Sequence, residues 1–385
     1  ALNSGRQVSL SASGMTISPS TISTDGGTAT FTMPAAAVGV AATFSDIIPA
    51  EENGFTGTLA IGDEGTLTLT ESGESITMIY AQDQANISFP TGTDDGTPAT
   101  LSTQFFMAET EVTNAVVAAV LQWAYDSGWF SSSGHNELSP STVKYGDQEL
   151  LDLDDSDCCQ VDYDGAGTFS AESGYENNPV TDISWYGAIM VCNWLTEMRD
   201  GNTNNAVYTN IDTTWQDDET IEDNAKNGYR LPTSGEWEYA ARYLGTTAPS
   251  TGDDLDTERL YGNDDSSWTD GYYWTPGDYA SGATADYNDG PACQAVAVYY
   301  WGQNPSPTDE AAVKNLGLGS TNTLGLYDMS GNVWEWCFTE SGSIRIYRGG
   351  SWGHDASDLR VGDWSITSPG NSDFFLGFRV CRTAD

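Results

Sequence analysis

The sequence predicts an α+β protein in which a small β-rich module precedes a larger domain that has few helices and many irregular loops. The chain has 385 residues, of which 38% are hydrophobic and 11% aromatic, enough for a sizeable packed core. Short apolar runs with partial alternation fill the start of the chain, whereas helical patterns occur only later. Beyond residue 241 the chain is mostly Gly, Asp, Ser, Tyr and Trp. Turns and aromatic packing are expected to hold that part together.

Residues 1–73 are predicted to form the small β module, and residues 74–385 the larger domain. The runs SLSASGMTI, TATFTM and VGVAATF suit strands, and Asp25-Gly26-Gly27 suits a hairpin turn. The segment resembles small Ig-like or surface-repeat modules of microbial surface proteins. A spacer role is favoured over a binding role for it.

Three helices are predicted in the larger domain. Thr113 can cap the first, whose apolar residues share one face and which ends near Gly128. The second covers residues 185–198, where apolar side chains are spaced for a buried stripe. Thr233 and Glu236 form a capping box at the start of the third.

The charge balance restricts the classes of partner. Fifty-six acidic residues oppose thirteen basic ones, for a formal net charge of −43. Such a surface repels nucleic acid and anionic lipid, so neither is expected as a partner. It suits divalent cations or a salty medium. No apolar stretch is long enough to cross a membrane, so no direct membrane insertion is expected.

The cysteines and histidines are too few or too scattered for a zinc site. The only histidines are His135 and His354, and no Cys-x-x-Cys pair occurs. An even number of cysteines fits an oxidising compartment, but a large domain does not need disulfides. The cysteines are Cys158, Cys159, Cys192, Cys293, Cys337 and Cys381.

Several motifs from about residue 75 to the end occur in the order typical of one family. They are MIYA at 78–81, EVTNA at 111–115, PVTDISWYGAIMVCNWL at 179–195, NGYRLPTSGEWEYAAR at 227–242, GLYDMSGNVWEWC at 325–337, RGGSW at 348–352 and GFRV at 377–380. Together they resemble the formylglycine-generating, or sulfatase-modifying, family. The resemblance implies that family's variant of the C-type lectin fold. It also implies a related cysteine pair, but whether Cys192 pairs with Cys381 stays open.

The same resemblance implies where an oxidase site would lie. The oxidase members carry two cysteines in the loop after the Gly-Gly-Ser-aromatic motif, because a thiolate pair is what copper binding and thiol oxidation need. Here those positions are His354 and Leu359, and no cysteine lies between Cys337 and Cys381. The expectation is a protein that is not an enzyme.

A structural calcium site is implied near the GLYDMSGNVWEW segment. The family's ligands map onto the side chains of Asp328 and Glu335 and the backbone carbonyls of Gly331 and Val333. Hard oxygen ligands from a tight loop suit Ca²⁺. The alternative is that both carboxylates only bond the loop itself, and the sequence does not decide between them.

The segment 348–381 alternates fixed-looking motifs with spacers, and this pattern resembles the variable proteins of diversity-generating retroelements. In that class, mutagenesis at adenines replaces the spacer residues. Apart from Trp364, each spacer residue here can arise from an AAC codon by changes at its two adenines. The expected variable face consists of Gly353, His354, Asp355, Ser357, Asp358, Leu359, Gly362, Asp363, Trp364, Ser365, Ile366, Ser372, Asp373, Phe374 and Phe375.

A rigid frame is expected to hold these spacers. Arg348, Arg360 and Arg379 can bond loop carbonyls or acidic partners, and Trp352 can fill the core. Trp364, Phe374 and Phe375 would be natural hot spots for a protein partner if exposed. Core packing is the alternative for all three, with one of the adjacent pair Phe374 and Phe375 pointing outward.

These observations favour a non-enzymatic ligand-binding protein for receptor binding or display on a virion or cell surface. Its partner would be a protein or surface receptor of unknown identity. The first alternative is a copper oxidase of the formylglycine-generating type or a related enzyme. The second is a calcium-dependent carbohydrate-binding lectin that uses aromatic faces and polar side chains.

Overall fold

The computed structural model describes most of the larger domain and, by backbone alone, three strands of the N-terminal module. The predicted turn at Asp25-Gly26-Gly27, His135 and Cys158 lie outside the described residues. Those residues are 6–12, 21–22, 40–46, 59–69, 72–83, 86–130, 136–154, 159–212, 215, 220–246, 271–299 and 320–384.

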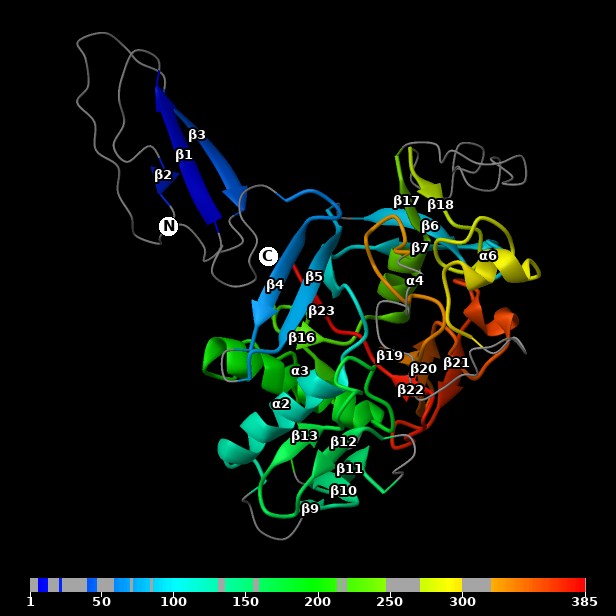
Figure 1. The fold of residues 1–385 in the computed structure, drawn as a ribbon. Coiled ribbons are helices and arrows are strands. Elements are labelled where there is room, and N and C mark those ends of the chain that lie inside the picture. The colour runs from blue at the N-terminus through cyan, green and yellow to red at the C-terminus, as the bar shows by residue number, and fades with distance from the viewer. Residues whose placement is uncertain are drawn as a thin grey trace, which may run out of the picture.

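The described strands of the N-terminal module form one antiparallel sheet in the order β2–β1–β3, blue in Figure 1. They agree with the β-rich character predicted there. The strands are β1 (Arg6–Ala12), β2 (Thr21–Ile22) and β3 (Val40–Asp46).

A five-stranded antiparallel sheet organises the larger domain in the order β16–β23–β8–β5–β4. The last strand of the chain, β23, lies between β16 and β8, so the two ends of this domain meet in one sheet. The strands are β4 (Glu64–Thr68), β5 (Ser75–Gln82), β8 (Phe105–Ala108), β16 (Tyr229–Arg230) and β23 (Cys381–Thr383). Because β4 pairs with β5, the sheet starts before the boundary predicted after Gly73.

Both faces of this sheet are covered, which explains why all four residues of β8 are buried. Side chains alternate across a strand. Phe106 and Ala108 pack into one core with helices α2 (Asn114–Asp126) and α3 (Trp185–Asp200). Phe105 and Met107 pack on the other face with Trp237 and Tyr239 of α4 (Ser234–Arg242). The domain therefore has helix, sheet and helix layers.

The three predicted helices are confirmed with their caps. Thr113 accepts from the Val116 amide at the start of α2. The capping box of Thr233 and Glu236 is present at α4. These ends were predictable because each cap depends on residues within one turn. Two shorter elements are α6 (Gly290–Gln294) and the 3₁₀ turn η1 (Ala356–Leu359).

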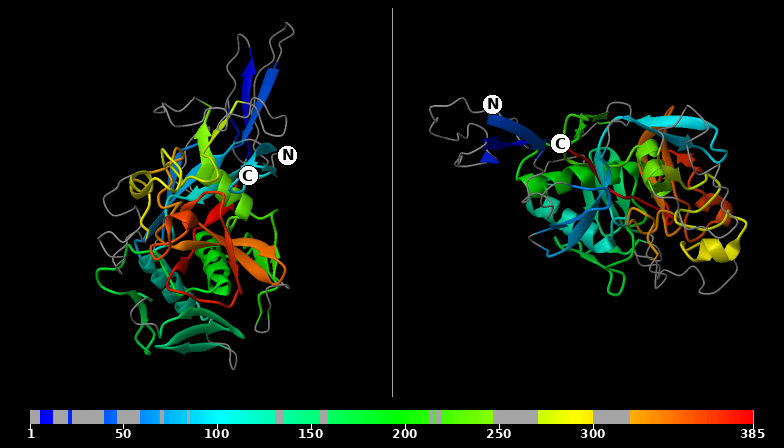
Figure 2. Two further views of the ribbon diagram at one scale, coloured as in Figure 1. Left: turned by 90° about the vertical axis from the view of Figure 1, so that its right-hand side faces the viewer. Right: turned by 90° about the horizontal axis from the view of Figure 1, so that it is seen from above.

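A second sheet of four strands carries the C-terminal segment, in the order β21–β20–β19–β22. Its strands are coloured orange to red in Figure 1 and face the viewer in the left view of Figure 2. β22 is parallel to β19, and the other pairs are antiparallel. The strands are β19 (Trp334–Ser341), β20 (Ile344–Arg348), β21 (Ser365–Thr367) and β22 (Leu376–Gly377).

The remaining described strands form short hairpins and one three-stranded sheet between long loops, as the fold prediction requires. They are β6 (Ile87–Thr91) with β7 (Thr97–Leu101); β9 (Glu137–Ser139), β10 (Thr142–Tyr145) and β11 (Gln148–Asp152); β12 (Val161–Tyr163) with β13 (Phe169–Ala171); β14 (Tyr208–Thr209) with β15 (Ile221–Glu222); and β17 (Tyr243–Gly245) with β18 (Tyr273–Trp274).

Glu222 in β15 should make the stability of the fold depend on pH. Burial raises the pKa of its carboxyl to about 7, although Arg230 lowers it. An unfolded Glu ionises near 4.5, so stability from this group is complete below that pH and is lost as the pH rises to about 7. We expect Glu222→Gln to stabilise the protein by about 2 kcal/mol more at about pH 8 than at about pH 5. Urea unfolding at both pH values measures this, with the exposed Glu172→Gln as control. Equal gains at both pH values would contradict it.

Candidate functional site

The segment 348–381 begins in the four-stranded sheet, rejoins it at β22 and ends in β23 of the five-stranded sheet. It leaves β20 at Arg348, passes through η1, returns as β21 on the edge beside β20, and re-enters as β22 beside β19. The predicted variable positions therefore lie mostly on loops and one edge strand, held by a sheet of fixed register.

Two of the predicted frame arginines are buried and bonded. Arg348 donates to Glu238 Oε2 at 2.7 Å, to Ser234 Oγ at 2.7 Å, and to the carbonyls of Val361 and Asp363. Arg379 donates to both oxygens of Glu335. These bonds hold the segment to α4 and β19, as the prediction of a rigid frame requires.

The other two frame residues lie nearer the surface than predicted. Arg360 is half-buried, donates to the Ser357 carbonyl and pairs with Asp363 at 3.2 Å. Trp352, predicted to fill the core, is half-buried and packs against Phe374 and Phe375 instead. Trp352 therefore belongs to the surface that the spacers form.

Most predicted spacer residues reach the surface. Trp364 is 46% exposed, Ile366 is 39% exposed, and Asp355 is also exposed. Neither Phe374 nor Phe375 is sealed in the core; both are half-buried, and their ring centroids are 3.9 Å apart. The half-buried positions are Gly353, His354, Ser357, Asp358, Asp363, Ser365, Ser372, Asp373, Phe374 and Phe375.

Two of the predicted spacer residues, Leu359 and Gly362, are buried, so the prediction that they reach the surface is wrong. Leu359 is fully buried in a small core with Ala280, Cys293 and Val296. Gly362 is buried against the backbone of Gly92, where a Cβ would overlap it. The sequence could not reveal either burial, because the covering residues lie far away in the chain.

The burial of Leu359 gives a direct test of which positions are exchangeable. We expect Leu359→Ala to lower the free energy of unfolding by about 2–4 kcal/mol, because it leaves a cavity in a packed core. Ile366→Ala, at an exposed position of β21, should change it by about 0.5 kcal/mol or less. Chemical denaturation of both variants measures the difference. Similar small losses would show that Leu359 is as exchangeable as its neighbours.

Four side chains of the segment form what we call the aromatic patch: Trp352, His354, Phe374 and Phe375. The Phe375 ring centroid lies 5.0 Å from Trp352 and 4.8 Å from His354. Phe374 lies 5.9 Å from Trp352. The patch joins the loop after β20 to the loop before β22, positions that are about twenty residues apart in the sequence.

The patch rests on residues that the sequence did not single out. The Trp334 indole donates to His354 Nδ1 at 3.3 Å, and Ser351 Oγ lies 2.6 Å from the same nitrogen. Nδ1 therefore accepts from the indole. A Cβ at position 353 would overlap the Phe375 ring. A larger residue at position 353 would therefore require the side chain at position 375 to change as well.

One of the predicted calcium ligands, Glu335, belongs to a buried ion pair. Glu335 is inaccessible, and both its oxygens accept from Arg379, while its Oε2 also accepts from the Trp237 indole at 2.8 Å. Asp328 is buried nearby in the left-handed region, with φ of 56°. A cation at this set would have to share Glu335 with the guanidinium. The residues fit Arg379 as the counter-charge better than they fit Ca²⁺, and the calcium set stays a prediction.

Glu111 is a third carboxylate beside this ion pair, and the sequence did not single it out. Burial first, and then Asp328, raise its pKa well above the usual range, while Arg379 lowers it. Asn332 Nδ2 lies 3.4 Å from Glu111 Oε2. Across the described ranges, no group of three or more His, Cys, Asp or Glu side chains is arranged to hold a metal ion.

None of the cysteines stands at the two positions where the resemblance places the oxidase cysteines. In the part of the chain that the structure describes, every cysteine is free and buried. Burial raises the pKa of Cys337 and Cys381 far above the thiol's usual range. His354 and Leu359 stand where the resemblance places the reactive cysteines, so neither a thiolate pair nor a soft metal ligand is present there.

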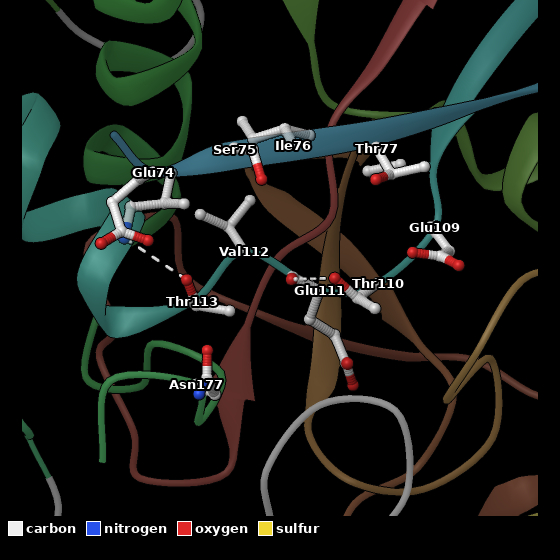
Figure 3. Close-up of a pocket in the computed structure, with 12 residues that line it drawn as sticks. Glu74, Ser75, Ile76, Thr77, Glu109, Thr110, Glu111, Val112, Thr113 and Asn177 are labelled. Atoms are coloured by element: carbon white, nitrogen blue, oxygen red, sulfur yellow. Dashed lines mark hydrogen bonds between the residues drawn. The ribbon is translucent and has the colours of Figure 1, made fainter. Parts of the chain in front are cut away.

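A separate cavity of about 190 Å³ lies between β5 and the segment before α2 (Figure 3). Its lining is largely polar and includes Glu74, Glu109 and Thr113. Figure 3 shows the Glu111 side chain directed away from β5. This cavity shares no residue with the segment 348–381.

The chain resembles known proteins both in sequence and in fold. Residues 70–384 match the family model of the sulfatase-modifying factor enzyme 1-like domain. Chaperone protein LppX of Paenibacillus barcinonensis is 34% identical over 216 residues, which are 51% of this chain and 65% of that protein. The formylglycine-generating enzyme of Streptomyces coelicolor is 27% identical over 312 residues, 73% of this chain and 79% of that enzyme.

Among solved structures, Treponema denticola variable protein 1 has a similar fold. Its TM-score is 0.50 at 23% identity, and the match covers 83% of this chain and 99% of that one. The predicted fold, a C-type-lectin-like fold of the formylglycine-generating type, is confirmed. No helix among the described residues is long and apolar enough to span a membrane.

Proposed function

Since the chain belongs to the family of the sulfatase-modifying factor enzyme 1-like domain but carries His354 and Leu359 where its oxidase relatives are expected to carry cysteines, we propose that it is a non-enzymatic ligand-binding protein. Its ligand face is formed by the spacers of the segment 348–381. The partner is a protein or surface receptor, and the protein is displayed on a virion or cell surface.

One observation carries this proposal: the same short segment alternates buried, bonded frame residues with accessible spacers. Arg348 and Arg379 are at most 4% exposed, whereas Trp364 and Ile366 are exposed large hydrophobic residues. Exposed large hydrophobic side chains are typical of interaction surfaces. Surface positions also tolerate substitution at a cost of about 0.5 kcal/mol or less, which diversification requires.

Diversification by a retroelement is the finer part of the proposal. The spacing of RGGSW and GFRV supports it, and so does the fold shared with a variable protein. Sequencing the locus across a population tests it. We expect substitutions to concentrate at the accessible spacers and to spare Arg348, Leu359, Gly362 and Arg379. Uniform drift along the chain, or strict invariance of the spacers, would overturn it.

The non-enzymatic part has its own test. Purified protein supplied with Cu(I) should not oxidise a cysteine-containing peptide, because neither His354 nor Leu359 supplies a thiolate. Copper-dependent oxidation lost in His354→Ala would select the enzyme alternative. Replacing the exposed Asp355 by Ala is the matched control.

A further inference from the structure

The aromatic patch presents ring surface at a fixed place. Trp352, Phe374 and Phe375 are each half-buried, so part of every ring is buried by its neighbours and part is accessible. The Phe375 amide donates to Asp373 Oδ1 at 3.2 Å, and Gly353 lies against the Phe375 ring. These contacts orient the rings before any ligand arrives, which lowers the entropic cost of binding.

Acidic residues outnumber basic ones in the segment that carries the patch. The segment 348–381 contains four aspartates, three arginines and no lysine. Arg348 and Arg379 are buried with Glu238 and Glu335, which leaves Arg360 as the arginine nearest the surface. Arg360 is itself paired with Asp363 and lies over the Tyr287 ring, 5.0 Å from its centroid.

The three other aspartates flank the patch in sequence and in space. Asp355 is exposed and follows His354, and Asp373 precedes Phe374. Asp358 is half-buried and lies near His354 and Asp363. The accessible rings are therefore edged by carboxylates that no buried arginine of the segment neutralises.

Partly accessible aromatic rings that lie beside carboxylates favour a positively charged ligand. A guanidinium or ammonium group is attracted to the face of an aromatic ring and pairs with a carboxylate at its edge. A phosphate or a carboxylate-rich ligand is repelled by the same edge.

Resting on the proposed function, we propose that in this chain the ligand face takes a basic segment of a partner protein, with an Arg or Lys side chain over the aromatic patch. Asp355, Asp358 and Asp373 pair with the neighbouring positive charges of that segment. The exposed Trp364, which precedes β21, and Ile366 of β21 supply apolar contacts. Specificity then comes from the side chains of the patch and association speed from the charge.

Selection of a random-peptide display library on the immobilised full chain tests this. The selected peptides should be enriched in Arg and Lys over the unselected library. Their affinity should fall about tenfold when Asp355, Asp358 and Asp373 are all replaced by Asn, because each of the three rim charge pairs contributes about twofold. The matched control replaces three exposed carboxylates of α2, β12 and the residue after β13: Asp126→Asn, Asp162→Asn and Glu172→Gln.

The outcomes separate this inference from the proposed function. Basic peptides weakened by the first triple variant and not by the control support the inference. Neutral or acidic peptides that need Trp352 and Phe374, as shown by loss of binding in Ala variants, would overturn it and leave the ligand face standing. If both triple variants weaken peptide binding equally, or if no substitution in the aromatic patch changes it, the inference is overturned. That result would also count against the ligand face.

Discussion

Replacing Arg379 by Met is expected to destabilise the protein by about 3–5 kcal/mol, among the largest effects for a single substitution. The guanidinium is fully buried between strands of the two sheets. It donates to Glu335, to the Ala108 carbonyl at 2.8 Å and to the Tyr327 carbonyl at 2.8 Å. Without it, three buried acidic groups, Glu111, Asp328 and Glu335, lose the guanidinium whose charge acts on them. Chemical denaturation at neutral pH measures the loss.

Arg360→Met provides the matched control for that substitution. Arg360 also pairs with a carboxylate, that of Asp363, but its side chain is 23% exposed, so its loss should cost about 1 kcal/mol or less. Equal losses in the two variants would contradict the central role of Arg379.

The experiment also probes the predicted calcium set. If calcium restores most of the stability of Arg379→Met, then Asp328, Gly331, Val333 and Glu335 can hold the ion.

Local signals made the helices and the fold predictable. The caps at Thr113 and Thr233 depend on residues within one turn, and each is present as the sequence indicates. The ordered motifs were sufficient for the C-type-lectin-like fold, which the match to residues 70–384 bears out. The strand β4 lies before the boundary predicted after Gly73, yet it pairs with β5, and this pairing could not be identified from local sequence.

The site was less predictable because burial there is decided by distant residues. Leu359 follows a run of accessible positions, yet residues from the 280s and 290s enclose it. Trp352 belongs to the RGGSW motif, yet it packs against Phe374 of the loop before β22 and therefore lies in the aromatic patch. Glu335 was assigned to a metal by resemblance, whereas Arg379, forty-four positions later, supplies its counter-charge. None of these partners can be identified from local sequence.

Replacing Arg348 by Met should combine a large loss of stability with a local change at the ligand face. The Arg348 side chain is buried over the Trp237 ring and joins Glu238 of α4 to the carbonyls of Val361 and Asp363. We expect a loss of about 3 kcal/mol, because Glu238 keeps only one of its two arginines. The loop from Val361 to Trp364 also loses the hydrogen bonds that the carbonyls of Val361 and Asp363 accept from Arg348. Hydrogen exchange should therefore accelerate at residues 361–367 beyond what the global loss explains.

Arg345 is the control that separates the two effects. It is also buried and lies on the same strand, but its side chain is on the opposite face of β20, over the Trp185 ring and bonded to the Phe338 carbonyl. Arg345→Met should lower global stability without selective exchange at 361–367. If both variants loosen that loop alike, then Arg348 does not position it, and the spacers owe their arrangement to the sheet alone. Selective loosening in Arg348→Met would show that one buried guanidinium fixes the backbone from which the exchangeable side chains project.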